Sequence, residues 1–79
     1  MNIQEAVKEG MEQKKMIKRK SWKSPERLIP TNDPYNLMVG YTGSKKTLPF
    51  RGWQPMADDL MANDWEVTSE SYQNLTLSM

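Results

Sequence analysis

Two tryptophans, Trp53 and Trp65, bracket a short segment that contains three aspartates. A tryptophan is costly to leave in water and is also a good platform for a flat ligand, so each of the two requires either burial or a partner. Pro55 suits the first position of a helix, and the residues after it predict a helix that ends near Ala62. Residues 64–69 then predict a final strand, so this segment favours a fold in which a short helix precedes a strand.

The end of this helix and the strand after it give the aromatic residues different roles. Asn63 can adopt the left-handed conformation that often ends a helix. In the strand, Trp65 and Val67 point to the same face, and burial statistics favour Trp65 as a core residue. Trp53 lies at the junction between loop and helix, where an aromatic residue serves equally well as a ligand contact or as a lid over the core.

An amphipathic helix is predicted near the start of the chain, over residues 3–13. Asn2, followed three residues later by Glu5, resembles a capping box at its beginning. Gly10 weakens the last turns of this helix. Its apolar stripe consists of Ile3, Ala6, Val7 and Met11.

The segments between the two helices favour strands. Residues 16–22 predict one strand, and residues 28–29 are a short apolar pair. Residues 35–41 alternate as a half-buried strand does, and residues 47–53 form the return strand of a hairpin. We therefore predict an α+β fold: an N-terminal helix packed on a small antiparallel sheet, with a short second helix before the last strand.

The length and composition of the chain limit its organisation. No linker or internal repeat divides the 79 residues, so we predict a single domain over residues 1–70 and a polar tail or arm over residues 71–79. A chain of this size buries only about 60 % of its unfolded surface, and its hydrophobic content of 37 % is low. We therefore expect association between copies of the chain. No apolar run is long enough for a signal peptide or a membrane span.

The composition argues against catalysis and metal binding. The sequence contains no cysteine and no histidine, so it offers neither a disulfide nor a common set of zinc ligands. Asp58 and Asp59 are adjacent on the predicted helix and point in different directions, so they do not form a catalytic pair. We favour structural roles instead: Asp58 or Asp59 stabilises the first helical turn through the helix dipole, and Asp64 accepts backbone hydrogen bonds at the turn. We expect no enzyme activity, no metal and no cofactor.

The charges are distributed unevenly along the chain. Residues 14–27 contain seven basic residues and one acidic residue, whereas residues 58–70 contain five acidic residues and no basic one. Such a chain can pair its own ends or those of neighbouring subunits, and its basic side can hold phosphate. A basic run is nevertheless more often a solvated face than a site.

The strand predicted over residues 16–22 places Arg19 and Trp22 on opposite faces. By its period of two, Lys18 and Lys20 lie on the same side as Trp22, which favours a ligand or interface role for Trp22. Arg19 points to the opposite face. Unless the strand bulges, Arg19 and Trp22 can therefore share a pocket only across an interface between subunits.

An Arg-x-x-Trp motif follows the amphipathic helix, and a Trp-x-Pro-x-x-x-Asp motif leads into Leu-Met-Ala-x-Asp-Trp-Glu-Val. These motifs resemble those of a known family of small phage proteins, the Thoeris anti-defence proteins of the second type. The resemblance extends from residue 3 to residue 67, and it departs from the family pattern at Met56, where a serine is usual. The matching residues are Arg19, Trp22, Trp53, Pro55, Asp59, Leu60, Met61, Ala62, Asp64, Trp65, Glu66 and Val67.

The resemblance implies a function that the residues alone do not specify. Members of the family bind a cyclic ADP-ribose isomer, the glycocyclic form made by bacterial TIR-domain sensors, without cleaving it. Some also take cyclic oligonucleotides, and members are homotetramers with ligand pockets between subunits. We therefore expect a sponge in the cytoplasm of the infected bacterial host, which blocks Thoeris immunity by sequestering this nucleotide. The predicted ligand-binding residues are Arg19, Lys20, Trp22, Trp53 and Asp59.

The alternative is a small phage protein that binds nucleic acid or a host protein. The basic residues 14–27 would carry nucleic-acid binding. The acidic residues that follow nearly cancel their charge, however, and a net charge of +1 with a pI of about 8.0 falls short of the usual basic footprint. Nucleic acid is therefore the less favoured partner.

Overall fold

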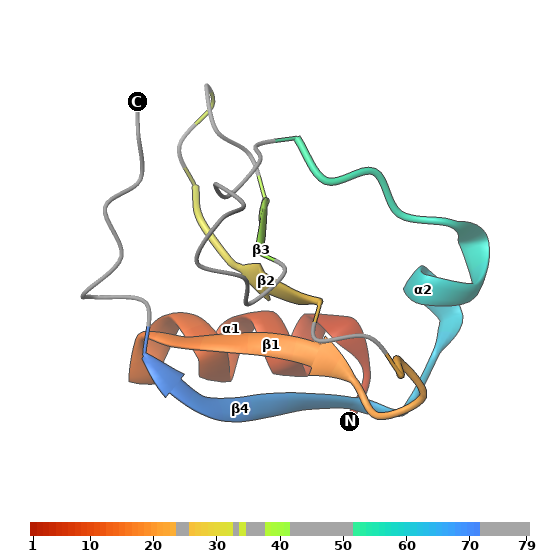
Figure 1. Cartoon of the computed structure of the whole chain (residues 1–79), viewed down its shortest axis with the longest axis horizontal. Coiled ribbons are helices and arrows are strands. Elements are labelled where there is room, and N and C mark those ends of the chain that lie inside the picture. Colours follow the sequence, from red (N-terminus) through yellow and green to blue (C-terminus); the bar gives the residue numbers. More distant parts are fainter. Residues whose placement is uncertain (24–25, 33, 35–37, 42–51, 72–79) are drawn as a thin grey trace.

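The chain folds into a helix packed on a four-stranded antiparallel sheet, with a second short helix beside the start of the last strand (Figure 1). The computed structural model describes residues 1–23, 26–32, 34, 38–41 and 52–71. The predicted α+β class is confirmed. The elements are, in chain order, α1 (Ile3–Gln13), β1 (Lys15–Arg19), β2 (Arg27–Ile29), β3 (Val39–Tyr41), α2 (Ala57–Met61) and β4 (Trp65–Ser71).

The first helix, α1, has the predicted bounds. The Asn2 side chain accepts the N–H of Glu5 at 2.8 Å, and Glu5 Oε1 accepts the N–H of Asn2 at 2.9 Å, so the capping box is confirmed. The helix ends at Lys14, which is left-handed with a φ of 56° and donates its N–H to the carbonyl of Gly10. A left-handed residue at this position satisfies a carbonyl that the helix itself leaves free.

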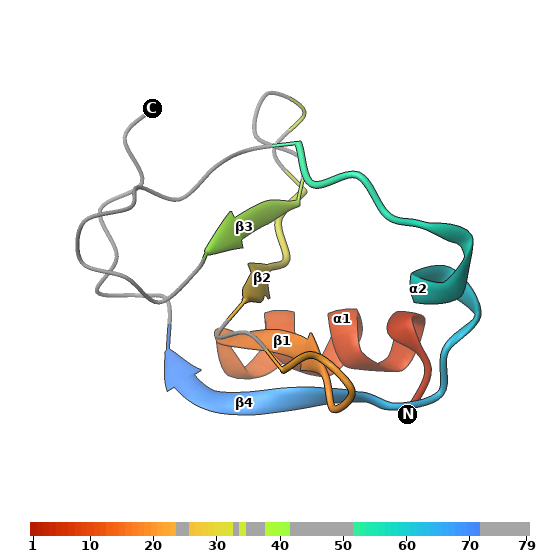
Figure 2. The ribbon, with the colours of Figure 1, turned by 45° about the vertical axis from the view of Figure 1, so that its right-hand side comes forward.

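The sheet has the strand order β3-β2-β1-β4. Ile17 lies at its centre, opposite Leu28 of β2 and Val67 of β4. Figure 2 shows that β1 and β4 lie along α1, whereas β2 and β3 turn away from it. The core between α1 and the sheet contains Ile17, Leu28, Ala6 and Trp65, each at most 2 % exposed.

The first strand is shorter than predicted, and this corrects the placement of Trp22. β1 ends at Arg19, and the chain then turns at Lys20 and Ser21. The backbone N–H of Trp22 donates to the carbonyl of Arg19 at 3.1 Å, a contact typical of a tight turn. Trp22 therefore lies outside the strand. The prediction that Arg19 and Trp22 lie on opposite faces of one strand is wrong. The turn brings both residues to the same end of the sheet.

The segment from Trp53 to β4 also differs from the prediction in detail. Pro55 is not the first helical residue, because α2 begins at Ala57 with Met56 as its N-cap. The helix ends at Met61, close to the predicted end near Ala62, and its C-cap at Ala62 is extended. Asn63 does not adopt the left-handed conformation, which Lys14 alone adopts among the described non-glycine residues. An extended backbone at Ala62 leads directly into β4, so no left-handed reversal is needed.

Several predictions lie partly outside the described residues. Of the strand predicted over residues 35–41, the structure places residues 39–41 in β3. The return strand over residues 47–53 lies outside the described part except for Gly52 and Trp53, which belong to no strand. The last strand continues to residue 71, and residues 72–79 of the predicted tail are not described. Within the described residues, neither helix has the length and hydropathy needed to cross a membrane.

Candidate functional site

The three tryptophans of the chain meet at the end of the sheet where β1 ends and β4 begins. Trp22 comes from the turn after β1, Trp53 from the segment before α2, and Trp65 from the first position of β4. Their ring centroids are 5.3 Å apart for Trp22 and Trp65, 6.1 Å for Trp53 and Trp65, and 6.3 Å for Trp22 and Trp53. All three pairs are edge-to-face, an arrangement that contributes about 0.5–1.5 kcal/mol per pair beyond the area it buries.

Trp65 is the buried member of this cluster. Its side chain belongs to the main core, and the residue is 1 % exposed. The indole N–H donates to the backbone carbonyl of Asp59 at 2.8 Å, so its polar group is satisfied inside the protein. The prediction that Trp65 is a core residue is confirmed.

Trp22 and Trp53 pack against this core but remain partly exposed. The backbone N–H of Trp53 donates to the carbonyl of Met38 at 2.9 Å, which ties the segment before α2 to the residue before β3. Gly52 has a φ of 74°, a conformation that glycine adopts without strain. Trp53 is therefore placed for both of its predicted roles, as a lid over the core and as a ligand contact, because its ring packs against the core and also lines a groove.

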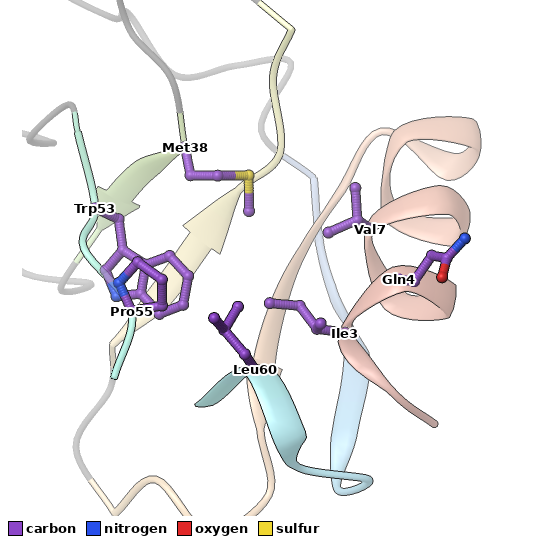
Figure 3. Close-up of a pocket in the computed structure, with 7 residues that line it drawn as sticks. All are labelled: Ile3, Gln4, Val7, Met38, Trp53, Pro55 and Leu60. Carbon is purple, nitrogen blue, oxygen red and sulfur yellow. The ribbon is translucent and has the colours of Figure 1, made fainter. Parts of the chain in front are cut away.

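The groove lies between α1, α2 and the segment that carries Trp53, and its volume is about 340 Å³ (Figure 3). A volume in this range fits a base-sized or somewhat larger ligand. Figure 3 shows the Gln4 amide directed away from the other side chains, so the wall is almost entirely apolar. The residues that line it are Ile3, Gln4, Val7, Met38, Trp53, Pro55 and Leu60. They carry no charge and can hold a flat uncharged ring, but not a phosphate.

Arg19 lies at the same end of the sheet and binds two carboxylates. Its Nε donates to Asp64 Oδ1 at 2.9 Å, and its Nη1 donates to Asp59 Oδ1 at 3.1 Å. Asp59 is 6 % exposed, so this ion pair is largely shielded from water. The hydrogen bond from Arg19 lowers the pKa of Asp64 to about 2, and the same bond raises the pKa of Arg19.

The two carboxylates also bind the backbone of neighbouring segments. Asp59 Oδ2 accepts the N–H of Met56 at 2.9 Å, which holds the first turn of α2. Asp64 Oδ2 accepts the N–H of Ser21 at 3.1 Å, in the turn after β1. The predicted backbone-binding role of Asp64 is confirmed. The donor, however, lies in the turn after β1 and not in the turn that precedes β4. We call Arg19, Asp59 and Asp64 with these contacts the arginine clasp.

The structure brings four of the five predicted ligand-binding residues together. Trp22 and Trp53 contact Trp65, and Arg19 binds Asp59, whose carbonyl holds the Trp65 indole. The fifth predicted residue, Lys20, has an exposed side chain in the turn after β1. Its backbone N–H donates to the carbonyl of Asp64 at 2.9 Å.

Sequence reasoning missed both the clasp and the groove. Each of the two motifs contributes to the clasp, with an arginine from one and two aspartates from the other, and this complementarity of charge was the available signal. The groove walls on α1, Ile3 and Val7, belong to the apolar stripe that the sequence already identified. The sequence offered no signal for Met38, which the contacts of the fold, including the backbone bond from Trp53, bring to the groove.

A comparison with known protein families matches residues 1–68 to the Thoeris anti-defense 2-like domain, also named Tad2-like. The chain belongs to the Thoeris anti-defense 2-like family. This match confirms the resemblance noted in the sequence and supports an anti-defence role. Within the match lie both halves of the arginine clasp and all three tryptophans. No curated protein and no solved structure matches the chain.

Methionine occupies position 56, where the resemblance implies a serine, and the structure shows the local effect. Met56 is the N-cap of α2 and makes no side-chain hydrogen bond to the helix. A serine in this place would accept a backbone N–H of the first turn. The first turn relies instead on Asp59, which binds the N–H of Met56.

Proposed function

We propose that this protein binds a cyclic ADP-ribose-type signalling nucleotide, the glycocyclic form, and sequesters it so that Thoeris immunity is blocked. Family membership supplies the anti-defence role. The observation that carries the choice of ligand class is the uncharged groove with Trp53 in its wall. An adenine stacked on an indole gains about 1–3 kcal/mol, and this gain needs no charged partner.

The phosphates of such a ligand require donors from outside the groove lining. Lys20 and Lys23 are exposed cations in and after the turn that carries Trp22. Cations of this kind bind phosphate as point charges. We propose that they complete the site between copies of the chain, in a homo-oligomer that the family resemblance suggests is a tetramer.

Capture without cleavage is the mechanism we propose. The chain has no histidine or cysteine to act as a proton shuttle or nucleophile near neutral pH. Sequestration requires that the amount of the sponge and its affinity together keep the free ligand below the concentration that activates the effector. Such a sponge would act where the signal is made, in the cytoplasm of the infected bacterium.

Recovery of the ligand tests this proposal directly. The purified 79-residue protein is mixed with glycocyclic ADP-ribose, washed, and denatured by heat, and the released material is identified by mass spectrometry. We expect intact ligand in an amount that does not exceed the protein. Cleaved product in excess of the protein would show turnover, and release of no nucleotide would favour the alternative, a module that binds nucleic acid or a host protein.

Tryptophan variants then locate the binding surface. Trp53→Ala and Trp22→Ala should each weaken the affinity by about 5- to 150-fold, because a stacked base loses its platform. Trp53→Phe keeps an aromatic ring and should retain most of the affinity. Trp65→Ala should instead lower the melting temperature, since truncation of a core tryptophan costs about 3–5 kcal/mol. Calorimetric titration and thermal melts on the four variants separate the two roles.

A further inference from the structure

The arginine clasp gives Arg19 a role different from that of a ligand contact. We infer that Arg19 is a positioning residue, which acts through Asp59 and Asp64 to fix the arrangement of the three tryptophans and does not bind the ligand. The part of this inference that concerns the ligand rests on the proposed function. The part that concerns the tryptophans rests on the contacts of the folded chain alone.

The first argument is the occupancy of the Arg19 guanidinium. Nε and Nη1 already donate to two carboxylates at 2.9 Å and 3.1 Å, and the side chain is only 18 % exposed. The clasp as a whole has one positive and two negative charges. A phosphate that approached Arg19 would therefore also approach Asp59 and Asp64, and like charges at such distances repel.

The second argument is the path from Arg19 to Trp65. Arg19 holds one carboxylate oxygen of Asp59, and the other oxygen holds the N–H of Met56. The carbonyl of Asp59 in turn accepts the indole N–H of Trp65 at 2.8 Å. Arg19 thus fixes the first turn of α2, which sets the position of the Trp65 ring.

The third argument is the path from Arg19 to Trp22. Asp64, which immediately precedes Trp65, accepts Nε of Arg19 and the N–H of Ser21. Its carbonyl accepts the N–H of Lys20. The turn that carries Trp22 is therefore tied to the start of β4, and Trp22 and Trp65 keep their separation of 5.3 Å.

The two possible roles of Arg19 predict opposite effects when the carboxylate is removed. If Arg19 binds phosphate, Asp64→Asn removes a repelling charge and frees a donor, so affinity for glycocyclic ADP-ribose should rise. If Arg19 is a positioning residue, Asp64→Asn should weaken affinity by about 10-fold, because an amide binds the guanidinium less strongly than a carboxylate, and Arg19→Ala should weaken it at least as much, because it also loses the bond to Asp59. The double variant should then lose little more affinity than Arg19→Ala alone, since residues that act as a unit are not additive.

A spectroscopic test needs no ligand. All three tryptophans of the chain lie in the cluster, so near-ultraviolet circular dichroism and tryptophan fluorescence report its geometry. At a temperature well below the melting transition, Arg19→Ala and Asp64→Asn should change both spectra in the same way. Arg19→Lys should change them too, because an ammonium cannot form the fork that reaches two carboxylates.

Lys18→Ala is the matched control. It removes a cation from the neighbouring position of β1, where Lys18 faces Glu66 across a loose ion pair of 3.9 Å. It should leave the tryptophan spectra unchanged. If Arg19→Ala does not fold, Arg19→Lys and Asp64→Asn carry the test.

Two results would overturn the inference: folded clasp variants with wild-type tryptophan spectra, or tighter binding by Asp64→Asn. A wild-type protein that does not bind glycocyclic ADP-ribose would instead refute the proposed function, and the spectral comparison would still decide whether Arg19 positions the tryptophans.

Discussion

Asp64 keeps its charge because of what surrounds its two oxygens. Arg19 and the Ser21 N–H bind the ionised form, which lowers the pKa of Asp64 from its ordinary 3.8 to about 2. A carboxyl group with a lowered folded pKa contributes its full stability above the unfolded pKa, and the contribution is lost as the pH falls through the folded pKa. The ion pair between Arg19 and Asp64 should therefore persist in mild acid and fail only in strong acid.

We expect the stability of the wild type to fall between pH 3.8 and about 2 partly because of this group. Asp64→Asn should be less stable at neutral pH and should show a shallower loss in that window. Urea unfolding at a series of pH values measures the slopes, and NMR titration of the Asp64 carboxyl carbon measures the midpoint directly. Asp58→Asn removes a charge of α2 that does not bind Arg19 and serves as the control. A midpoint near 3.8 would contradict the expectation.

Gly10 is required by packing, although its helix propensity is poor. A Cβ at this position would lie 2.7 Å from Ile17 Cγ2 and 3.1 Å from the carbonyl oxygen of Lys15. Alanine normally stabilises a helix by about 1 kcal/mol relative to glycine, whereas overpacking costs about 1–3 kcal/mol. The carbonyl oxygen belongs to the backbone and cannot move away easily.

We therefore expect Gly10→Ala to lower the free energy of unfolding by up to about 2 kcal/mol net. Chemical denaturation checks this value. Lys8→Ala, at an exposed position of the same helix, should change the stability by less than about 0.5 kcal/mol. A stabilised Gly10→Ala variant would show that α1 can shift away from Ile17 without cost.

At the scale of secondary structure, the two helices are stabilised by different means. α1 has a complete capping box and a left-handed end, so its bounds follow from its own residues. α2 has only five residues and no side-chain cap at Met56. An isolated helix of this length does not form in water, so α2 depends on the arginine clasp and on the contact with Trp65.

Met56→Ser should stabilise the protein by about 0.5–2 kcal/mol, because serine accepts a backbone N–H that methionine leaves without a side-chain partner. Met56 is 69 % exposed, so little apolar contact is lost. Thermal unfolding of the two proteins measures the change. Met56→Ala removes the same side chain without adding an acceptor and should show no such gain; equal stability of the serine and alanine variants would argue against a capping deficit.

At the scale of the whole molecule, one surface remains apolar although it faces water. Met56, Leu60 and Met61 of α2 are 69 %, 55 % and 70 % exposed, respectively. Leu60 and Pro55 extend this surface into the groove. Contiguous exposed apolar residues are typical of interaction sites, and they support the proposal that copies of the chain associate.

We expect light scattering at micromolar concentration to give a mass well above the 9.2 kDa of one chain. Met61→Glu places a charge on the exposed apolar surface and should shift the protein toward the monomer, because an unpaired charge in an interface is costly. Gln13→Glu adds the same charge at an exposed position of α1 and should leave the mass unchanged. A wild-type mass near that of one chain would refute the oligomer and, with it, a ligand site between copies.

The sequence alone determined the features that depend on neighbours a few positions apart. The capping box needs only Asn2 and Glu5, three residues apart, and the apolar stripe needs only the helical period. For this reason α1 was predicted with its observed bounds. The burial of Trp65 was also predictable, because a strand that alternates charged and apolar residues must turn its large apolar side chain inward.

Only the tertiary structure decided which distant residues meet. Arg19 binds carboxylates 40 and 45 residues further along the chain, and no local pattern specifies such a pairing. The early end of β1 also depends on a distant residue, because the carbonyl and carboxylate of Asp64 accept the backbone N–H groups of Lys20 and Ser21 in the turn. A residue's partner across the chain depends on loop closure and packing of the whole fold, and these decided that Arg19 faces two aspartates while Trp22 and Trp53 face Trp65.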